Sequence, residues 1–546
     1  MNRSLFHATL FSVALCSCTL NLELGDRPEG DAGIAHVNDG GPNPTPVSPF
    51  SVKKLSAHGN HTCALFENGR VKCWGDNQYG QLGIGKSWAV MAAASSPSRA
   101  NTGPWDIDYH QEPIDPYDWL QAICGGHVPC DPPGGSPTSH RPEACNSYLP
   151  DVNYPGEHAC IMGDEPNETG VGLPYVELGA GRFATSIAAG YGQTCAILDN
   201  GKVKCWGYGP SLGLGDYRSR GDGPNEMGDA LPFVDLGTNR TAIGLAANSQ
   251  ATCAILDDGK VKCWGSNYFG ALGIPDANAT YYPQGWSWRY WGFEGADIRG
   301  ARPSEMGDAL AAVDLGIARR ATALALGDGA CAVLDDGNVK CWGRNASADH
   351  PYVGTAEMKL GDALVNLRLV ARSVVAGADG HSCALLENAR VACWGPNTWG
   401  GLGTGDKDER RFRDTLSYVN LGSGRTARAI AAGGHHTCAV LDNGRIKCWG
   451  DNRSGQLGVA DADTRGFGPG QMGDALPYVE LGSNRTVRAI AAGFEHTCAV
   501  LDNGRVKCWG DNKFGQLGLG YTKSRGDSPD EMGDALDYVD LGTGQP

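Results

Sequence analysis

The chain has 546 residues, a formal net charge of −16 and 20 cysteines, and 41% of its residues are hydrophobic. Its 80 Gly and 30 Pro residues are many, but the apolar fraction and the 14 Trp residues argue against an unfolded chain. An acidic surface repels a phosphate backbone, and no run of Lys and Arg reverses the charge locally. Composition therefore excludes nucleic acid as an expected partner.

Residues 1–18 have the pattern of an export signal, in which Arg3 precedes a short apolar stretch and then small residues and cysteines. The last four residues of this segment, 15–18, resemble a bacterial lipobox, which implies lipid modification of Cys18. Cleavage without a lipid is the alternative. We expect an outer-membrane lipoprotein of the bacterial envelope, periplasmic or surface-exposed, or otherwise a secreted protein, with residues 19–50 as a flexible Gly/Pro/Asp-rich tether.

From residue 51 to residue 546 the sequence repeats one unit seven times. The unit is Cys-Ala, six variable residues, Val-x or Ile-x, and Cys-Trp-Gly. An Asn-Gly or Asp-Gly pair stands between the two cysteines, except where Ala389 replaces Gly, and the β-favouring runs beside it predict a hairpin. The seven cysteine pairs are Cys63 and Cys73, Cys195 and Cys205, Cys253 and Cys263, Cys331 and Cys341, Cys383 and Cys393, Cys438 and Cys448, and Cys498 and Cys508.

The predicted hairpin places the two cysteines of each copy opposite one another. Counting outward from a three-residue turn, with Gly504 in the left-handed conformation, pairs Leu501 with Arg505 and Cys498 with Cys508. Such a non-hydrogen-bonded pair suits a disulfide, which contributes ~2–3 kcal/mol by closing a short loop. Reduced cysteines and zinc ligands are the alternatives; the export signal disfavours the first, and the absence of Cys-x-x-Cys or His partners disfavours the second.

Three further runs complete each unit: a small-residue run such as Ala-Ile-Ala-Ala-Gly, then Asp-Asn-x-x-Gly-Gln-Leu-Gly, then Met-Gly-Asp-Ala-Leu with a following Tyr-Val-Asp-Leu-Gly. Together these runs resemble the repeat of the RCC1 family over nearly everything after residue 50. The resemblance implies an all-β, seven-bladed β-propeller with four-stranded blades. The last copy is followed by an unmatched Tyr-Val-Asp-Leu-Gly at 538–542, so we expect the C-terminal strand to complete the first blade and close the ring.

Two insertions and two irregular copies interrupt the repeat. The insertion at 86–170 holds four further cysteines, which allow three disulfide connectivities. The fourth copy lacks Gly-x-Leu-Gly, and the second reads Gly-Pro-Ser-Leu-Gly at 209–213, so we expect irregular edges on those blades. The four cysteines of the insertion are Cys124, Cys130, Cys145 and Cys160.

The insertion at 276–302 is rich in aromatic residues. Rigid aromatic side chains beside an arginine suit a protein interface or a sugar-stacking surface, and packing onto the propeller is the alternative. The candidate ligand-binding residues are Trp286, Trp288, Arg289, Tyr290 and Trp291.

The sequence favours a binding or scaffold protein over an enzyme, with no cofactor, metal or catalytic residue expected. No Gly-x-Ser-x-Gly, His-Glu-x-x-His or phosphate-loop motif occurs. We expect a monomer that binds a protein or a cell-surface glycan and reaches the membrane only through its N-terminal lipid. Because a fold does not select an activity, a hydrolase or lyase with its active site at the propeller mouth is the alternative. Histidines at matching repeat positions are interpreted as structural: His58, His61, His435, His436 and His496.

Overall fold

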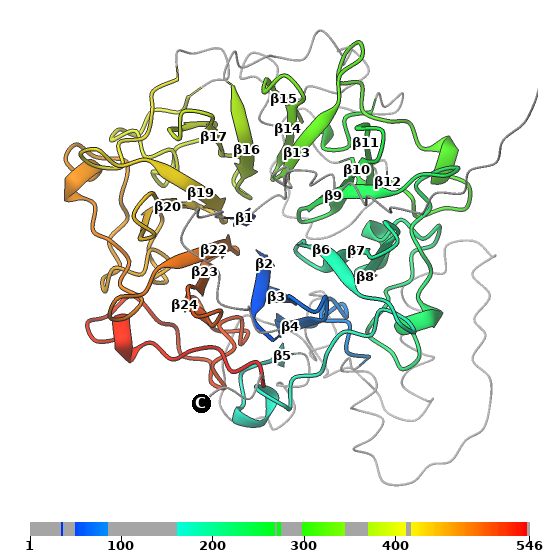
Figure 1. The fold of residues 1–546 in the computed structure, drawn as a ribbon, viewed down its shortest axis with the longest axis horizontal. Coiled ribbons are helices and arrows are strands. Elements are labelled where there is room, and N and C mark those ends of the chain that lie inside the picture. The colour runs from blue at the N-terminus through cyan, green and yellow to red at the C-terminus, as the bar shows by residue number, and fades with distance from the viewer. Residues whose placement is uncertain are drawn as a thin grey trace, which may run out of the picture.

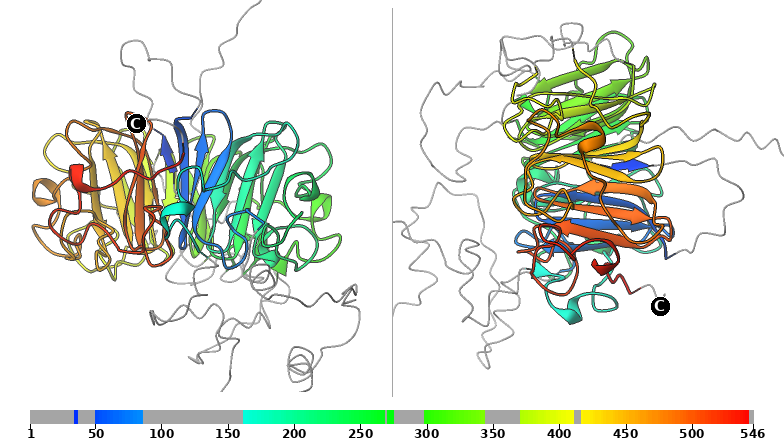
Figure 2. Two further views of the ribbon diagram at one scale, coloured as in Figure 1. Left: turned by 90° about the horizontal axis from the view of Figure 1, so that it is seen from below. Right: turned by 90° about the vertical axis from the view of Figure 1, so that its left-hand side faces the viewer.

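The computed structural model describes residues 34–36, 50–85, 161–267, 270–274, 298–343, 370–410 and 416–542. These residues form seven antiparallel sheets that stand side by side around a common centre (Figure 1). Seen from the side, the strands run between two opposite faces of this assembly (Figure 2). The all-β prediction is confirmed, and seven blades fit the seven sheets. The predictions that lie outside the described residues concern Cys18, Cys124, Cys130, Cys145, Cys160, Trp286, Trp288, Arg289, Tyr290 and Trp291.

Each sheet has an inner strand near the centre, a middle strand and an outer strand (Figure 1). The inner strands are β2 (Val52–His58), β6 (Ala184–Ala189), β9 (Ala242–Ala247), β13 (Ala321–Leu326), β16 (Ala371–Ala376), β19 (Ala427–Ala432) and β22 (Val487–Ala492). The middle strands are β3 (His61–Phe66), β7 (Gln193–Leu198), β10 (Ala251–Leu256), β14 (Gly329–Leu334), β17 (Ser382–Leu386), β20 (His436–Leu441) and β23 (His496–Leu501). The outer strands are β4 (Val71–Asp76), β8 (Val203–Gly207), β11 (Val261–Ser266), β15 (Val339–Gly343), β18 (Val391–Trp394), β21 (Ile446–Gly450) and β24 (Val506–Gly510).

The predicted fourth strand is much reduced. Among the described residues, only the first and third sheets gain a short outer edge, from β5 (Ile161–Met162) and β12 (Ile298–Arg299). The run that follows Met-Gly-Asp-Ala-Leu keeps a backbone hydrogen bond to the outer strand, as from the Val234 amide to the Val203 carbonyl at 2.9 Å, whereas the chain before it turns at Gly228, where φ is 63°. The short 3-10 turns are η2 (Pro166–Glu168), η3 (Gly209–Ser211), η4 (Gly228–Ala230), η6 (Gly307–Ala309), η8 (Gly473–Ala475) and η9 (Gly533–Ala535).

The C-terminal segment lies along the seventh sheet and reaches the first. The amide of Val539 donates a 2.9 Å hydrogen bond to the Val506 carbonyl of β24. The Lys72 ammonium of β4 donates a 2.8 Å hydrogen bond to the Leu541 carbonyl. The prediction that this segment supplies the fourth strand of the first blade is wrong, because β5 already occupies the edge of β4.

A short strand, β1 (Ile34–His36), pairs antiparallel with the inner edge of β22. It belongs to the range 19–50, which the sequence predicts to be a tether. The backbone partner of Ile34 is Ala491, and that of His36 is Ala489. A stretch of three residues at the N-terminal side therefore adds a strand to the seventh sheet.

The disulfide prediction agrees with the structure in register and in pairing. Cys498 of β23 faces Cys508 of β24, and their Cα atoms are 4.1 Å apart. The turn between them has Gly504 at φ 76°, and the Leu501 amide donates to the Arg505 carbonyl, as the count from the turn predicts. The bonded pairs are Cys63–Cys73, Cys195–Cys205, Cys253–Cys263, Cys331–Cys341, Cys383–Cys393, Cys438–Cys448 and Cys498–Cys508.

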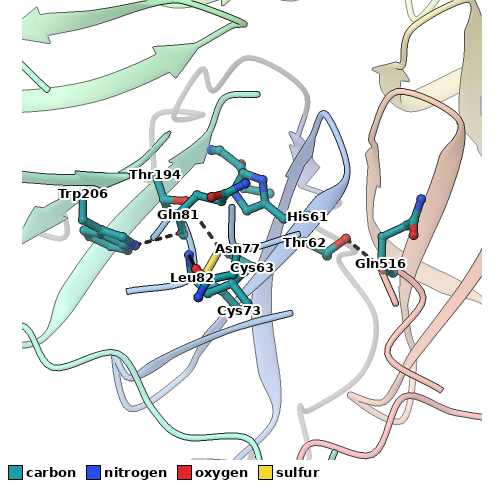
Figure 3. Close-up of a disulfide and its surroundings, with 12 residues drawn as sticks. His61, Thr62, Cys63, Cys73, Asn77, Gln81, Leu82, Thr194, Trp206 and Gln516 are labelled. Carbon is teal, nitrogen blue, oxygen red and sulfur yellow. Dashed lines mark hydrogen bonds between the residues drawn. A yellow bond between two sulfur atoms is a disulfide. The ribbon is translucent and has the colours of Figure 1, made fainter. Parts of the chain in front are cut away.

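The hydrophobic core lies at the seams between neighbouring sheets. Figure 3 shows the seam between the first and second sheets, where the Gln81 carbonyl accepts hydrogen bonds from Thr194 Oγ1 (2.8 Å) and Trp206 Nε1 (3.0 Å). His61 Nε2 lies 2.9 Å from the same Thr194 hydroxyl. The tryptophan of Cys-Trp-Gly and the loop of Gly-Gln-Leu-Gly thus join one sheet to the next, which explains why both recur in the repeat.

Candidate interaction face

One face of the propeller gathers half-buried aromatic side chains. The loops after the inner strands and the loops after the outer strands lie at this face, because inner and outer strands of an antiparallel sheet run in the same direction. On the fifth to seventh sheets these loops carry Trp399, His435 and Phe494, which we call the aromatic cluster. The His435 ring lies 5.9 Å from the Trp399 ring and 5.5 Å from the Phe494 ring, centroid to centroid.

A carboxylate that is 12% exposed lies between two histidines beside this cluster. Asp379 Oδ1 lies 2.5 Å from His381 Nδ1, and Asp379 Oδ2 lies 3.3 Å from His435 Nδ1. Burial alone would raise the pKa of the Asp379 carboxyl, but the charge and hydrogen bond of His381, with His435 close by, hold it well below its usual range. The His381 side chain is fully buried, whereas 22% of the His435 side chain is exposed. His435 is therefore the member of this group that a partner can reach.

An arginine covers the outer side of the cluster. The Arg453 guanidinium lies 4.1 Å above the centroid of the Trp399 ring and pairs with the buried carboxylate of Asp451 at 2.9 Å. The Asp451 side chain is 0% exposed and the Arg453 side chain is 54% exposed. The paired carboxylate orients the guanidinium, and the ring is attracted to its charge. The site thus offers flat apolar surface beside fixed hydrogen-bond donors and acceptors.

Hydrogen bonds at the seams hold the loops of this face in place. Thr497 Oγ1 donates a hydrogen bond to the Gln456 carbonyl at 3.0 Å, so its oxygen accepts the contact from His436 Nε2 at 2.8 Å. The proton of the neutral His436 ring is therefore on Nε2. Burial, together with the charge of His381, lowers the pKa of His436 to about 3. The ring stays neutral and acts as a structural donor.

The histidines therefore divide into two groups. His61, His436 and His496 are buried and bond threonines of the following sheet at 2.9, 2.8 and 2.8 Å, which supports the structural interpretation. His435 precedes His436 in the chain but lies at the face, beside Trp399 and Phe494. The repeat position alone did not separate the two roles.

The irregular second copy alters its seam, as the sequence indicates. Its loop forms η3, whose Ser211 hydroxyl donates a 3.0 Å hydrogen bond to the Gln250 carbonyl. Among the described residues, the buried Nε1 of Trp264 in the third sheet has no hydrogen-bond partner. The seam between the second and third sheets therefore lacks the hydrogen bond from tryptophan to a carbonyl that Figure 3 shows, while Gln193 Nε2 donates to the Asn248 carbonyl at 3.0 Å.

The residues of this face were not among the sequence candidates. A usable signal was present, because Trp399 stands where Tyr79 and Phe514 stand in their own Asn-x-x-Gly runs. An aromatic residue recurring at a variable loop position suggests exposure with a role in contact. Asp379 gave no such signal, because its copy carries more residues in this loop than any other copy does. Within the described residues, no three His, Cys, Asp or Glu side chains gather as a metal site.

Comparison with known proteins identifies the repeat. The profile of the Regulator of chromosome condensation (RCC1) repeat matches residues 52–81, 184–211, 243–271, 427–456 and 487–516. The chain contains RCC1 repeats. These five matches fall on the first, second, third, sixth and seventh sheets, and each begins on an inner strand.

Relatives with RCC1-like sequences cover parts of the chain. The Ultraviolet-B receptor UVR8 of Arabidopsis thaliana is 28% identical over 348 residues, which are 61% of this chain and 66% of that protein. Protein pim1 of Schizosaccharomyces pombe is 26% identical over 322 residues, which are 56% of this chain and 55% of that protein. The chain thus spans less than two thirds of the length of these two relatives.

Solved structures with a similar fold include yeast RCC1 (Prp20) bound to Kap60, with 20% identity, a TM-score of 0.47 and coverage of 64% of this chain and 74% of that chain. Human WBSCR16 has 16% identity, a TM-score of 0.45 and coverage of 64% and 81%.

Proposed function

We propose that this protein is an extracytoplasmic scaffold, anchored by a lipid on Cys18, that binds a partner protein through the loops of its propeller. The ring is closed between the seventh and first sheets with the help of the C-terminal segment. The contact between Lys72 and Leu541 supports this closure, as do the Phe494 amide and Gly59 carbonyl, which are 2.9 Å apart. The RCC1 repeats support the assignment as a protein-binding scaffold.

The compartment is proposed from the cysteines and the N-terminal sequence together. The seven disulfides favour an oxidising environment, because thiols in a reducing cytosol seldom persist as structural disulfides. None of the helical turns in the described residues is long and apolar enough to cross a bilayer. A lipid on Cys18, followed by a tether, would place the propeller at the surface of an envelope membrane.

The aromatic cluster carries the proposal for binding. Trp399, His435 and Phe494 come from three neighbouring sheets and are held by Asp379 and by the seams, so little conformational entropy is lost when a partner covers them. Aromatic side chains and arginine dominate the energetics of protein interfaces. A glycan could also stack on the rings, and Arg453 and Asp379 would then bond its hydroxyl groups.

Affinity capture from the native envelope, followed by mass spectrometry, tests the proposal. Replacing Trp399 and Phe494 together by Ala should abolish capture of the partner found with the unmodified protein, while thermal stability stays nearly unchanged. The matched control is Phe233→Ala, which removes a 43% exposed ring outside the aromatic cluster. Equal capture by the double variant would remove this face from the proposal. Turnover of a hydrolase or lyase substrate by the purified protein would replace binding by catalysis.

A further inference from the structure

The inner strands carry an arc of basic side chains at the end of the ring where these strands begin, which we call the mouth; β1 lies against β19, β22 and β2. The second residue of each inner strand stands at a β-bulge near the hairpin turns, on the face opposite to the aromatic cluster. In the fifth, sixth, seventh and first sheets this residue is basic, and we call these four residues the basic arc: Arg372, Arg428, Arg488 and Lys53.

The four side chains lie on consecutive sheets. Strand β16 neighbours β19, β19 neighbours β22, and β22 neighbours β2, with Cα atoms of neighbouring strands within 8 Å of each other. The equivalent residues of the remaining sheets are Thr185, Ile243 and Thr322, so the charge is confined to one side of the mouth. All four residues of the arc are basic, whereas the whole chain is acidic, with a net charge of −16.

The local carboxylates do not neutralise the arc. Asp442 and Asp502, in the adjacent hairpin turns, pair with Arg425 at 3.1 Å and with Arg485 at 3.4 Å. Arg372 donates hydrogen bonds only to backbone carbonyls in this part of the structure. Among the described residues, the remaining three members of the arc form no ion pair or side-chain hydrogen bond, and all are half-buried or exposed.

A small pocket lies where the arc ends. Lys53 lines a pocket of about 320 Å³ together with Phe66, Phe183 and Thr185. Phe183 is 47% exposed, which leaves an apolar wall beside the last cation. Glu67 also lines the pocket and is exposed. The mouth therefore combines a row of unpaired cations with a place for one apolar side chain.

We propose that this mouth binds an extended, acidic peptide segment of a partner protein, whose carboxylates pair with the basic arc and whose apolar residue enters the pocket beside Phe183. Two residues of an extended chain span about 6.6 Å. This is comparable with the Cα separations of up to 8 Å by which neighbouring inner strands contact each other. A guanidinium binds a carboxylate through two parallel hydrogen bonds, which suits Arg428 and Arg488 to this role. This inference rests on the proposed binding function and adds the chemistry of one partner segment.

Fluorescence anisotropy with a labelled peptide of four alternating glutamates and a terminal leucine tests the inference on the full-length folded protein. The double variant Arg428→Gln/Arg488→Gln should weaken binding about tenfold, since each partly exposed pair contributes a few-fold. The control Arg302→Gln/Lys513→Gln removes two charges from exposed side chains outside the arc and should change binding less than about twofold. Glu67→Gln should strengthen binding, because it removes a like charge beside the peptide.

Equal weakening by the control and arc variants would reduce the effect to net charge and overturn the inference. A sulfated oligosaccharide that binds through the same arginines more tightly than the peptide would assign the mouth to a glycan and overturn it as well. Loss of peptide binding with unchanged partner capture through Trp399 and Phe494 would separate the two surfaces. Failure of capture by every form of the protein, with peptide binding intact, would reject the proposed scaffold role and not the basic arc.

Discussion

Acidification should destabilise this propeller through its seam histidines. Burial, with the charges of neighbouring histidines, lowers the pKa of His61, His436 and His496 to about 3, from 6.5 in an unfolded chain. Between these two values the unfolded chain binds protons that the folded chain rejects, so the free energy of unfolding rises with pH. The stabilisation is complete above pH 6.5 and is lost as the pH falls toward 3.

The size of the effect follows from the difference between the pKa of each histidine in the unfolded chain and its pKa in the folded protein. Each pH unit below 6.5 costs about 1.4 kcal/mol for each histidine, so pH 4.5 costs about 3 kcal/mol for one and up to about 8 kcal/mol for three. The neighbouring histidine charges contribute to one another's shifts, so the sum is an upper bound. An effect of this size is comparable with the whole stability of an ordinary domain.

Gln is the matched replacement, because Gln193 occupies the same position in the second sheet and is fully buried there. The triple variant of His61, His436 and His496 to Gln should be less stable at pH 7, by about 1 kcal/mol for each lost hydrogen bond to threonine. It should also lose less stability on going to pH 4.5. Guanidinium unfolding at both pH values, followed by tryptophan fluorescence without reductant, measures the difference. An equal pH dependence in both proteins would refute the reasoning, because carboxylates such as Asp379 are present in both.

Three further predictions concern the repeat itself. Ala389 has φ 62°, so Ala389→Gly should stabilise the protein by about 0.5–1 kcal/mol in thermal unfolding. Gly504→Ala should destabilise it by more than that, because the added Cβ would also lie 2.7 Å from Ser51 Oγ; the reverse order would contradict the turn geometry. Because the 14 cysteines of the seven hairpin disulfides are at most 1% exposed, dithiothreitol should reduce these bonds only as fast as the protein unfolds, and rapid thiol labelling at these positions under native conditions would contradict this. Amide hydrogen exchange should be faster at the seam of Trp264 than at the seams that contain a His–Thr contact. Uniform protection around the ring would contradict a stabilising role of the His–Thr contacts.

The sequence alone predicts the features that depend on residues within one repeat, such as the hairpin register and the disulfide pairing. The turn residues and the ten-residue spacing placed Cys498 opposite Cys508, because hairpin register is set by the turn. Seven copies gave seven sheets in the described residues. The second copy, with Pro210 in its loop, was recognised as irregular, and the partnerless Trp264 Nε1 lies at that seam. The fourth strand is shorter than the sequence predicts, because the chain turns at glycines such as Gly228 and only the part after the turn bonds to the outer strand.

The tertiary structure decided which residues from different copies meet. Trp399, His435 and Phe494 lie in three copies and approach one another only because the sheets are arranged around a common centre (Figure 1). Arg428 and Arg488 are 60 residues apart in the chain, so a search of the sequence for basic clusters finds nothing at either position. A repeat determines the unit and its turns because these are local, whereas a binding surface depends on distances between units, which are fixed only when the seams have packed.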